Sequence, residues 1–146
     1  MDYYPIYLDL RGRRVLVAGA GKVALRKTRG LLEAGARVVV VAPRWLPEFE
    51  SLPVELRRRP FEPADLEGAC LAFTAADNRE VNRGVASEAR KRGIPVNVAD
   101  VPGECDFIVP ARLERGGVQI AISTGARDPR LAARMRRRLE DLLSEP

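Results

Sequence analysis

The stretch VLVAGAGKVALRK at Val15–Lys27 constrains the fold more than any other part of the sequence. Small and β-branched residues lead into two glycines, Gly19 and Gly21, and a basic segment with helical spacing follows at once. This order is typical of a phosphate-binding turn between a buried strand and a helix, with Ala24 allowing close packing of the two. The helix N-terminus then offers N–H groups to the phosphates. We therefore predict a dinucleotide site here.

Strand and helix patterns alternate through the first 105 residues. Apolar runs predict buried parallel strands at residues 14–18, 37–43, 69–76 and 94–100, and a half-exposed strand at 53–61. Helices are predicted at residues 22–34, ending at Gly35, and at 79–92, with Asp77 as the N-cap. The pattern predicts an α/β fold, a Rossmann-like doubly wound parallel sheet, over residues 1–105.

The pattern changes in the last part of the chain, residues 106–146. Residues 106–124 indicate a β-hairpin around Gly116-Gly117, and residues 128–143 indicate a helix capped by Asp128. One stripe of that helix is apolar: Leu131, Met135, Leu139 and Leu142. A hairpin and helix of this kind either cover their own domain or pair with a second subunit. We expect the second, and so a homodimer.

Net charge and cysteine content limit the classes of partner and of metal site that we expect for this protein. The net charge is +5, nearly all of the positive charge comes from arginine, and this surplus fits nucleic acid, an anionic membrane or a polyanionic small molecule. Aromatic residues make up only 5% and form no stacking array, which disfavours nucleic acid. With no histidine and two separated cysteines, we expect no metal site. Without a signal peptide or an apolar run of ~20 residues, we expect a cytoplasmic protein and no membrane partner.

No acidic residue occupies the position that usually binds the ribose of the dinucleotide. Ala42, Pro43, Arg44 and Trp45 follow the second strand, where an Asp or Glu commonly accepts the ribose 2′-hydroxyl. Arg44 can meet the 2′-phosphate of NADP, pack along the adenine or remain solvated. The motif alone leaves NAD and NADP open.

Five longer motifs narrow the interpretation to one family. They are YPIYLDLRGRRVLVAGAGKVALRK, LLEAGARVVVVAP, FTAADNREVN, VNVADVPGECDFIVPA and IAISTGARDPRLA, and they span Tyr4 to about Glu140. On these motifs the chain resembles the precorrin-2 dehydrogenase family, the dehydrogenase and ferrochelatase portion of siroheme synthase. The resemblance implies a Rossmann domain followed by a dimerisation segment that also borders the substrate cleft. It further implies NAD-dependent oxidation of precorrin-2 to sirohydrochlorin, in a family that typically lacks the ribose acid.

The same resemblance implies site residues. The matching cofactor positions are Gly19, Gly21, Lys22, Val23, Pro43, Arg44, Ala75, Ala76 and Asp77. The essential aspartate of the family matches Asp100, which we expect to act as general base, because parallel strands present functional residues at their carboxyl ends. For the carboxylates and ring of the tetrapyrrole we expect contacts with Asn97, Thr124, Arg112 and Arg127.

Two departures from the family stand out. Ala126 replaces a glycine in the loop after Thr124, and alanine tolerates positive φ poorly. Many relatives also continue into a further helical domain, whereas this sequence ends at Pro146. The missing histidine favours a dehydrogenase without the additional ferrochelatase activity. The alternative is a non-catalytic module that senses NAD(H), which accounts for the glycine turn but not for the Asp100 motif or the arginine excess.

Overall fold

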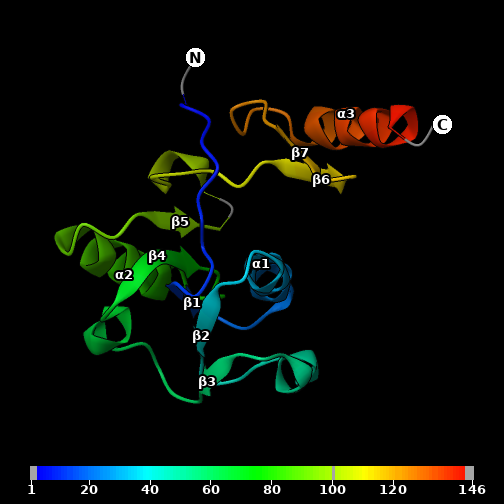
Figure 1. The fold of residues 1–146 in the computed structure, drawn as a ribbon. Coiled ribbons are helices and arrows are strands. Elements are labelled where there is room, and N and C mark those ends of the chain that lie inside the picture. Colours follow the sequence, from blue (N-terminus) through cyan, green and yellow to red (C-terminus); the bar gives the residue numbers. More distant parts are fainter. Residues whose placement is uncertain (1–2, 100, 144–146) are drawn as a thin grey trace. The chain divides into compact units, whose positions relative to one another are not determined.

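The computed structural model describes residues 3–99 and 101–143. The chain divides into two compact units, Ile6–Phe107 and a second made of the described residues of Met1–Pro5 and Ile108–Pro146. Figure 1 labels their elements. Within the described residues, no helix is long and apolar enough to cross a membrane.

The first unit is built on a sheet of five parallel strands. They are β1 (Arg14–Ala18), β2 (Arg37–Val41), β3 (Glu55–Arg57), β4 (Ala69–Thr74) and β5 (Val96–Val98), in the order β3-β2-β1-β4-β5. The chain winds outward from β1 toward β3, then crosses over to β4 and winds the other way (Figure 1). The predicted doubly wound α/β fold is confirmed, and its winding reverses between β1 and β4, where ligands bind in folds of this kind.

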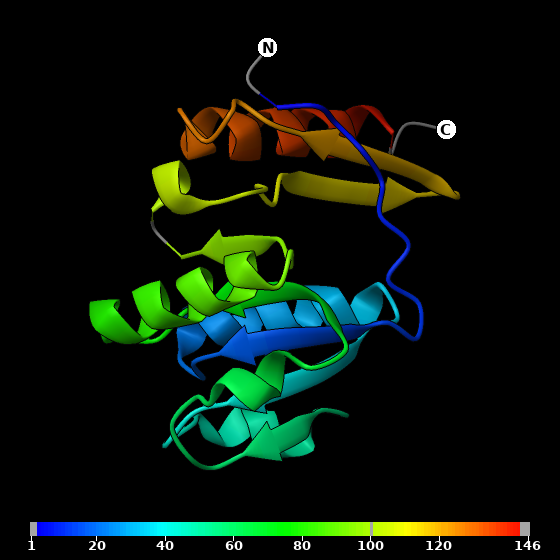
Figure 2. The ribbon, with the colours of Figure 1, turned by 90° about the vertical axis from the view of Figure 1, so that its left-hand side faces the viewer.

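Two helices cover the two faces of this sheet. The alternation of side chains along β1 sends Val15 and Val17 into one apolar cluster with α1 (Lys22–Glu33), whereas Leu16 and Ala18 join a second cluster with α2 (Arg79–Lys91). Figure 2 shows α1 and α2 on opposite sides of the strands. Burial on both faces explains why β1 and β2 read as unbroken apolar runs.

Several predicted boundaries are wrong, all at the ends of elements. The expected strand at 53–61 is only Glu55–Arg57, and the one at 94–100 is only Val96–Val98. Short 3₁₀ turns, which the sequence pattern did not reveal, occupy Pro47–Ser51, Pro63–Leu66 and Pro102–Glu104.

The predicted N-cap of α2 also needs correction. Asn78, not Asp77, is the capping residue, since its Oδ1 accepts hydrogen bonds from the amides of Glu80 and Val81 at 2.8 and 3.4 Å. Asn78 is the extended residue directly before the first helical turn, and only a side chain at that position reaches those amides.

The second unit is the predicted hairpin and helix. Strands β6 (Ala111–Arg115) and β7 (Val118–Ile122) pair antiparallel around Gly116 and Gly117, whose φ values of 57° and 78° suit a tight hairpin turn. Helix α3 (Pro129–Leu142) packs on β6, and the Asp128 carboxylate caps it by accepting from the Leu131 amide at 2.8 Å. Met135 and Leu142, from the predicted apolar stripe, stay exposed.

Candidate functional site

The glycine turn after β1 lies where three strands end. The Gly19 amide donates to the Val41 carbonyl at the end of β2 (2.9 Å), and the Ala75 amide, just beyond β4, donates to the Ala18 carbonyl (2.8 Å). Gly19 has φ 110°, and a Cβ added there would lie 2.5 Å from the Ala75 carbonyl carbon and 2.6 Å from the Ala76 nitrogen. Glycine is therefore required at position 19 by the backbone that crosses beside it.

No contact within the protein explains why position 21 is a glycine. Its φ is −87°, which any residue adopts, and, its chain neighbours apart, no described atom lies within 4 Å of the position that a Cβ would take. Among the described residues no side chain caps α1, and its first turn carries no acid, so neither a cap nor the helix's own first turn competes for the amides of Lys22 and Val23. Open space above Gly21 beside uncapped N–H groups fits a dinucleotide pyrophosphate.

The loop after β4 forms the other wall of the turn. Asn82, on the first turns of α2, is 6% exposed and holds the loop with two hydrogen bonds. Its Oδ1 accepts from the Ala76 amide (3.0 Å) and its Nδ2 donates to the Ala76 carbonyl (2.9 Å). Ala75 is half-buried and Asp77 is exposed at the end of this loop. Asn82 was not predicted as a site residue, although a polar residue on the helix face that carries Val85 and Ala89 is a signal that the sequence contains.

The segment after β2 borders the same turn. The Leu46 amide donates to the Ala20 carbonyl at 3.1 Å, which places residues 43–46 beside the glycines. Pro43 and Arg44 are both exposed there, and Trp45 is half-buried. Arg44 was predicted from the sequence as a cofactor-binding residue, whereas no role was predicted for Trp45.

The end of β5 contains a polar network. The Asn97 side chain is 5% exposed, accepts a hydrogen bond from Lys27 Nζ (2.7 Å) and donates to the Phe107 carbonyl (2.9 Å). The Ala99 amide donates to the Thr74 carbonyl at 2.9 Å, so the chain reaches residue 99 beside the end of β4. Asp100, the predicted general base, lies outside the described residues, and its role stays a prediction. Asn97 is placed within the wall of the unit, bonded to protein groups.

The remaining predicted substrate residues belong to the second unit. Thr124 Oγ1 accepts from the Asp128 amide and donates to the Asp128 carbonyl, both at 3.0 Å, so its hydroxyl closes the loop before α3. Ala126 adopts φ 63° in that loop, a conformation that costs alanine about 1 kcal/mol. Arg127 lies in the same loop and Arg112 on β6, both exposed.

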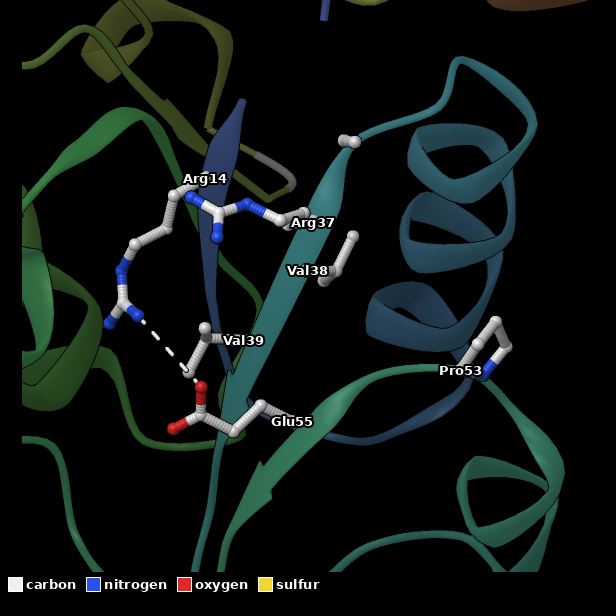
Figure 3. A pocket seen from close by; sticks show the side chains of 7 residues that line it. Arg14, Arg37, Val38, Val39, Pro53 and Glu55 are labelled. Carbon is white, nitrogen blue, oxygen red and sulfur yellow. Dashed lines mark ion pairs between the residues drawn. The ribbon is translucent and has the colours of Figure 1, made fainter. Parts of the chain in front are cut away.

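A hollow elsewhere on the first unit is a poor candidate. It is lined by Arg14, Ala36, Arg37, Val38, Val39, Pro53 and Glu55, with Arg14 and Glu55 paired at 3.9 Å (Figure 3). Arg14 and Arg37 begin β1 and β2, so this hollow lies at the amino edge of the sheet, away from the glycine turn. Across the described part of the chain, no three Cys, Asp or Glu side chains gather as a metal site.

Comparisons with known proteins give matches over most of the chain. Residues 6–111 match a family described as "Putative NAD(P)-binding". The chain is 46% identical over 144 residues to the siroheme synthase of Methylococcus capsulatus and 45% identical over 147 residues to that of Methylobacillus flagellatus. These alignments cover 96% and 98% of the chain, which spans 30% and 32% of the length of the two relatives.

A solved structure is similar over nearly the whole chain. It is that of SirC, a precorrin-2 dehydrogenase, with a TM-score of 0.83 and 30% sequence identity. The match covers 96% of this chain and 71% of that one, so both the sheet unit and the hairpin unit have counterparts in one known protein.

Proposed function

Because the chain belongs to the NAD(P)-binding family matched over residues 6–111 and to the family of the precorrin-2 dehydrogenase SirC, we propose that it oxidises precorrin-2 to sirohydrochlorin with NAD. The observation that carries the proposal is the likeness to SirC, which runs through the hairpin unit as well as the sheet unit. A generic dinucleotide module accounts for the first unit only. The motif-based family prediction is confirmed by these matches.

The glycine turn holds the dinucleotide in this proposal. The amides of Lys22 and Val23 bind the pyrophosphate above Gly21, where no described side chain competes. Pro43 and Arg44 border the adenosine, whereas Ala75, Ala76 and Asp77 border the nicotinamide half, on the loop that Asn82 holds. When bound, the dinucleotide supplies the two-electron oxidant of the reaction.

The protein's own chemistry is orientation and removal of a proton. Oxidation of precorrin-2 removes one hydride and one proton, and Asp100 accepts the proton as general base, which is worth about 10²–10⁴-fold. Arg112 and Arg127 attract the substrate carboxylates, Thr124 shapes the loop between them, and Asn97 lies on the strand leading to Asp100. The free Cys70 and Cys105 are compatible with a cytoplasmic site for this reaction.

The second unit pairs two copies of the chain in this proposal. Val118 on β7 and Met135 and Leu142 on α3 are 52%, 39% and 63% exposed, which is unusual for large apolar side chains on a small unit. A homodimer buries them. Light scattering coupled to size exclusion should give twice the chain mass, and Leu142→Lys should shift it toward the monomer; a monomeric wild type at micromolar concentration would remove this part of the proposal.

The activity is tested directly with freshly generated precorrin-2. Sirohydrochlorin formation is followed by absorbance with NAD, for the wild type, Asp100→Asn and the control Asp9→Asn, which changes an exposed carboxylate bonded to Arg11. We expect turnover by the wild type and the control, and a loss of at least about 10²-fold in Asp100→Asn with unchanged NAD affinity. Binding of NAD without any turnover by the wild type would overturn the proposal and favour a sensing module.

A further inference from the structure

Helix α3 carries most of its positive charge on one face. Its exposed arginines recur at intervals of four, three and one residues, and they are Arg130, Arg134, Arg137 and Arg138. Residues with this spacing lie on the same side of a helix, one turn above another. We call these four residues the arginine stripe.

The described part of the chain does not neutralise the arginine stripe. Over residues 3–99 and 101–143, none of its four guanidinium groups has a hydrogen bond or an ion pair. The remaining arginine of the helix, Arg136, differs because it binds Glu140 at 2.7 Å. Asp141 is the one acid of α3 with the spacing of the stripe, and it lies at the far end. Since like charges three and four residues apart destabilise a helix, the stripe weakens α3 and suits a ligand that brings negative charge.

The arginine stripe begins at the loop that we assign to the substrate. Thr124 Oγ1 bonds both the amide and the carbonyl of Asp128, and Arg127 lies in the loop that this pair closes. Because Asp128 caps α3, Arg130 lies in the first helical turn, and Arg138 lies about 12 Å further along the axis. The stripe therefore leads, within one unit, to the proposed substrate residues Thr124 and Arg127.

We propose that the arginine stripe is a capture surface for the polycarboxylate tetrapyrrole, which it attracts before the ring reaches the loop at Thr124. This inference rests on the proposed function and adds a role in substrate capture, not in the chemical step. Guanidinium groups complement carboxylates, which they bind through two parallel hydrogen bonds. A surface charge of one sign raises the rate of association with a ligand of the opposite sign by about 10–10³-fold, and salt screens this effect.

Steady-state kinetics with freshly generated precorrin-2 and saturating NAD test the proposal at ionic strengths of about 20 mM and about 500 mM. The test variant is Arg134→Gln/Arg138→Gln, which removes charge from the stripe and keeps residues that favour helix about equally. The control is Arg13→Gln/Arg29→Gln, at exposed arginines of the first unit, which changes the net charge by the same amount.

The two ionic strengths should separate the variants. At the low one, we expect the test variant to lower kcat/KM by about fivefold or more and to leave kcat unchanged, because the attraction acts before the chemical step. At the high one, where the Debye length is about 4 Å, the test variant and the wild type should have the same kcat/KM. The control variant should lower kcat/KM by less than about twofold.

Asp141→Asn tests the sign of the effect. It removes the acid at the far end of the stripe, so it should raise kcat/KM at the low ionic strength and leave kcat unchanged. An unchanged or lower kcat/KM would contradict the proposal.

The failures are distinguishable. If the wild type turns over precorrin-2 and the test variant has the same kcat/KM at the low ionic strength, the capture surface is wrong and the proposed function stands. If the test and control variants lower kcat/KM equally, net charge alone attracts the substrate, and the proposal for the stripe is wrong. If the wild type shows no turnover, the proposed function fails, and this inference fails with it.

Discussion

The α carbon of Gly19 passes so close to the Ala75–Ala76 peptide that a methyl group on it would lie 2.5 Å from the Ala75 carbonyl carbon. This approach joins the ends of β1 and β4, the two strands between which the winding of the sheet reverses. The turn and the opposite loop of the proposed dinucleotide site are therefore positioned by one backbone contact.

The two glycines of the turn should respond differently to alanine. Gly19→Ala should lower the free energy of unfolding by about 3 kcal/mol in urea titrations, because it adds both backbone strain at φ 110° and overlap with Ala75. Gly21→Ala should lower the free energy of unfolding by less than about 1 kcal/mol, the cost of alanine at an N-cap, since apart from its chain neighbours no described atom lies near its Cβ position. It should nevertheless weaken NAD binding by at least about tenfold, because the methyl group takes the space assigned to the pyrophosphate. Retained affinity in Gly21→Ala would place the pyrophosphate elsewhere.

Asn82 should affect both stability and binding. Asn82→Ala removes both hydrogen bonds to Ala76, which should lower the free energy of unfolding by about 2 kcal/mol and raise the Kd of NAD. Asn78→Ala is the matched control, since it removes the α2 cap at a cost of about 1 kcal/mol without releasing Ala76. Equal NAD affinities in the two variants would show that the loop does not depend on Asn82.

The ion cluster at Asp65 should make stability depend on acid pH. Burial alone raises the pKa of this carboxyl, but hydrogen bonds from Arg59, the Glu62 amide and Arg57 outweigh it and lower the pKa from 3.8 to about 2. Because the folded-state pKa is the lower one, the stabilisation is complete above pH 5 and is lost as the pH falls through 4 toward 2.

Urea unfolding between pH 7 and pH 2 measures this contribution. The difference in unfolding free energy between the wild type and Asp65→Asn should shrink by about 2 kcal/mol over that range. Glu48→Gln, at an exposed carboxylate, should show no such trend. A constant difference for Asp65→Asn would mean that its charge contributes nothing to the fold.

Ala126 offers a stabilising substitution. Its φ of 63° is favourable for glycine, so Ala126→Gly should raise the free energy of unfolding by about 0.5–1 kcal/mol. Ala133→Gly, inside α3, is the control with the opposite sign and should lower it by about 1 kcal/mol. Thermal unfolding of the two variants and the wild type measures these effects. If Ala126→Gly is less stable than the wild type, the backbone at Ala126 is not strained.

Features that depend on neighbouring residues could be predicted from the amino-acid sequence alone. Local spacing decides which residues are buried and which cap a helix. The sequence therefore predicted the buried strands β1 and β2, the helix α1 after two glycines and the Asp128 cap of α3. The same local spacing indicated the α/β fold and the dinucleotide turn, whereas the family was indicated by the resemblance of five longer motifs.

Features that depend on residues far apart in the chain are visible only in the folded structure. The edge strands β3 and β5 are short because each pairs over three residues only, with β2 and β4, and an apolar run does not reveal where its partner ends. Two such contacts are the hydrogen bond between Asn82 and Ala76 and the stacking of Arg58 on Trp45, each of which joins different segments of the chain. Such contacts arise only when the folded chain brings those elements together, so no local pattern records them.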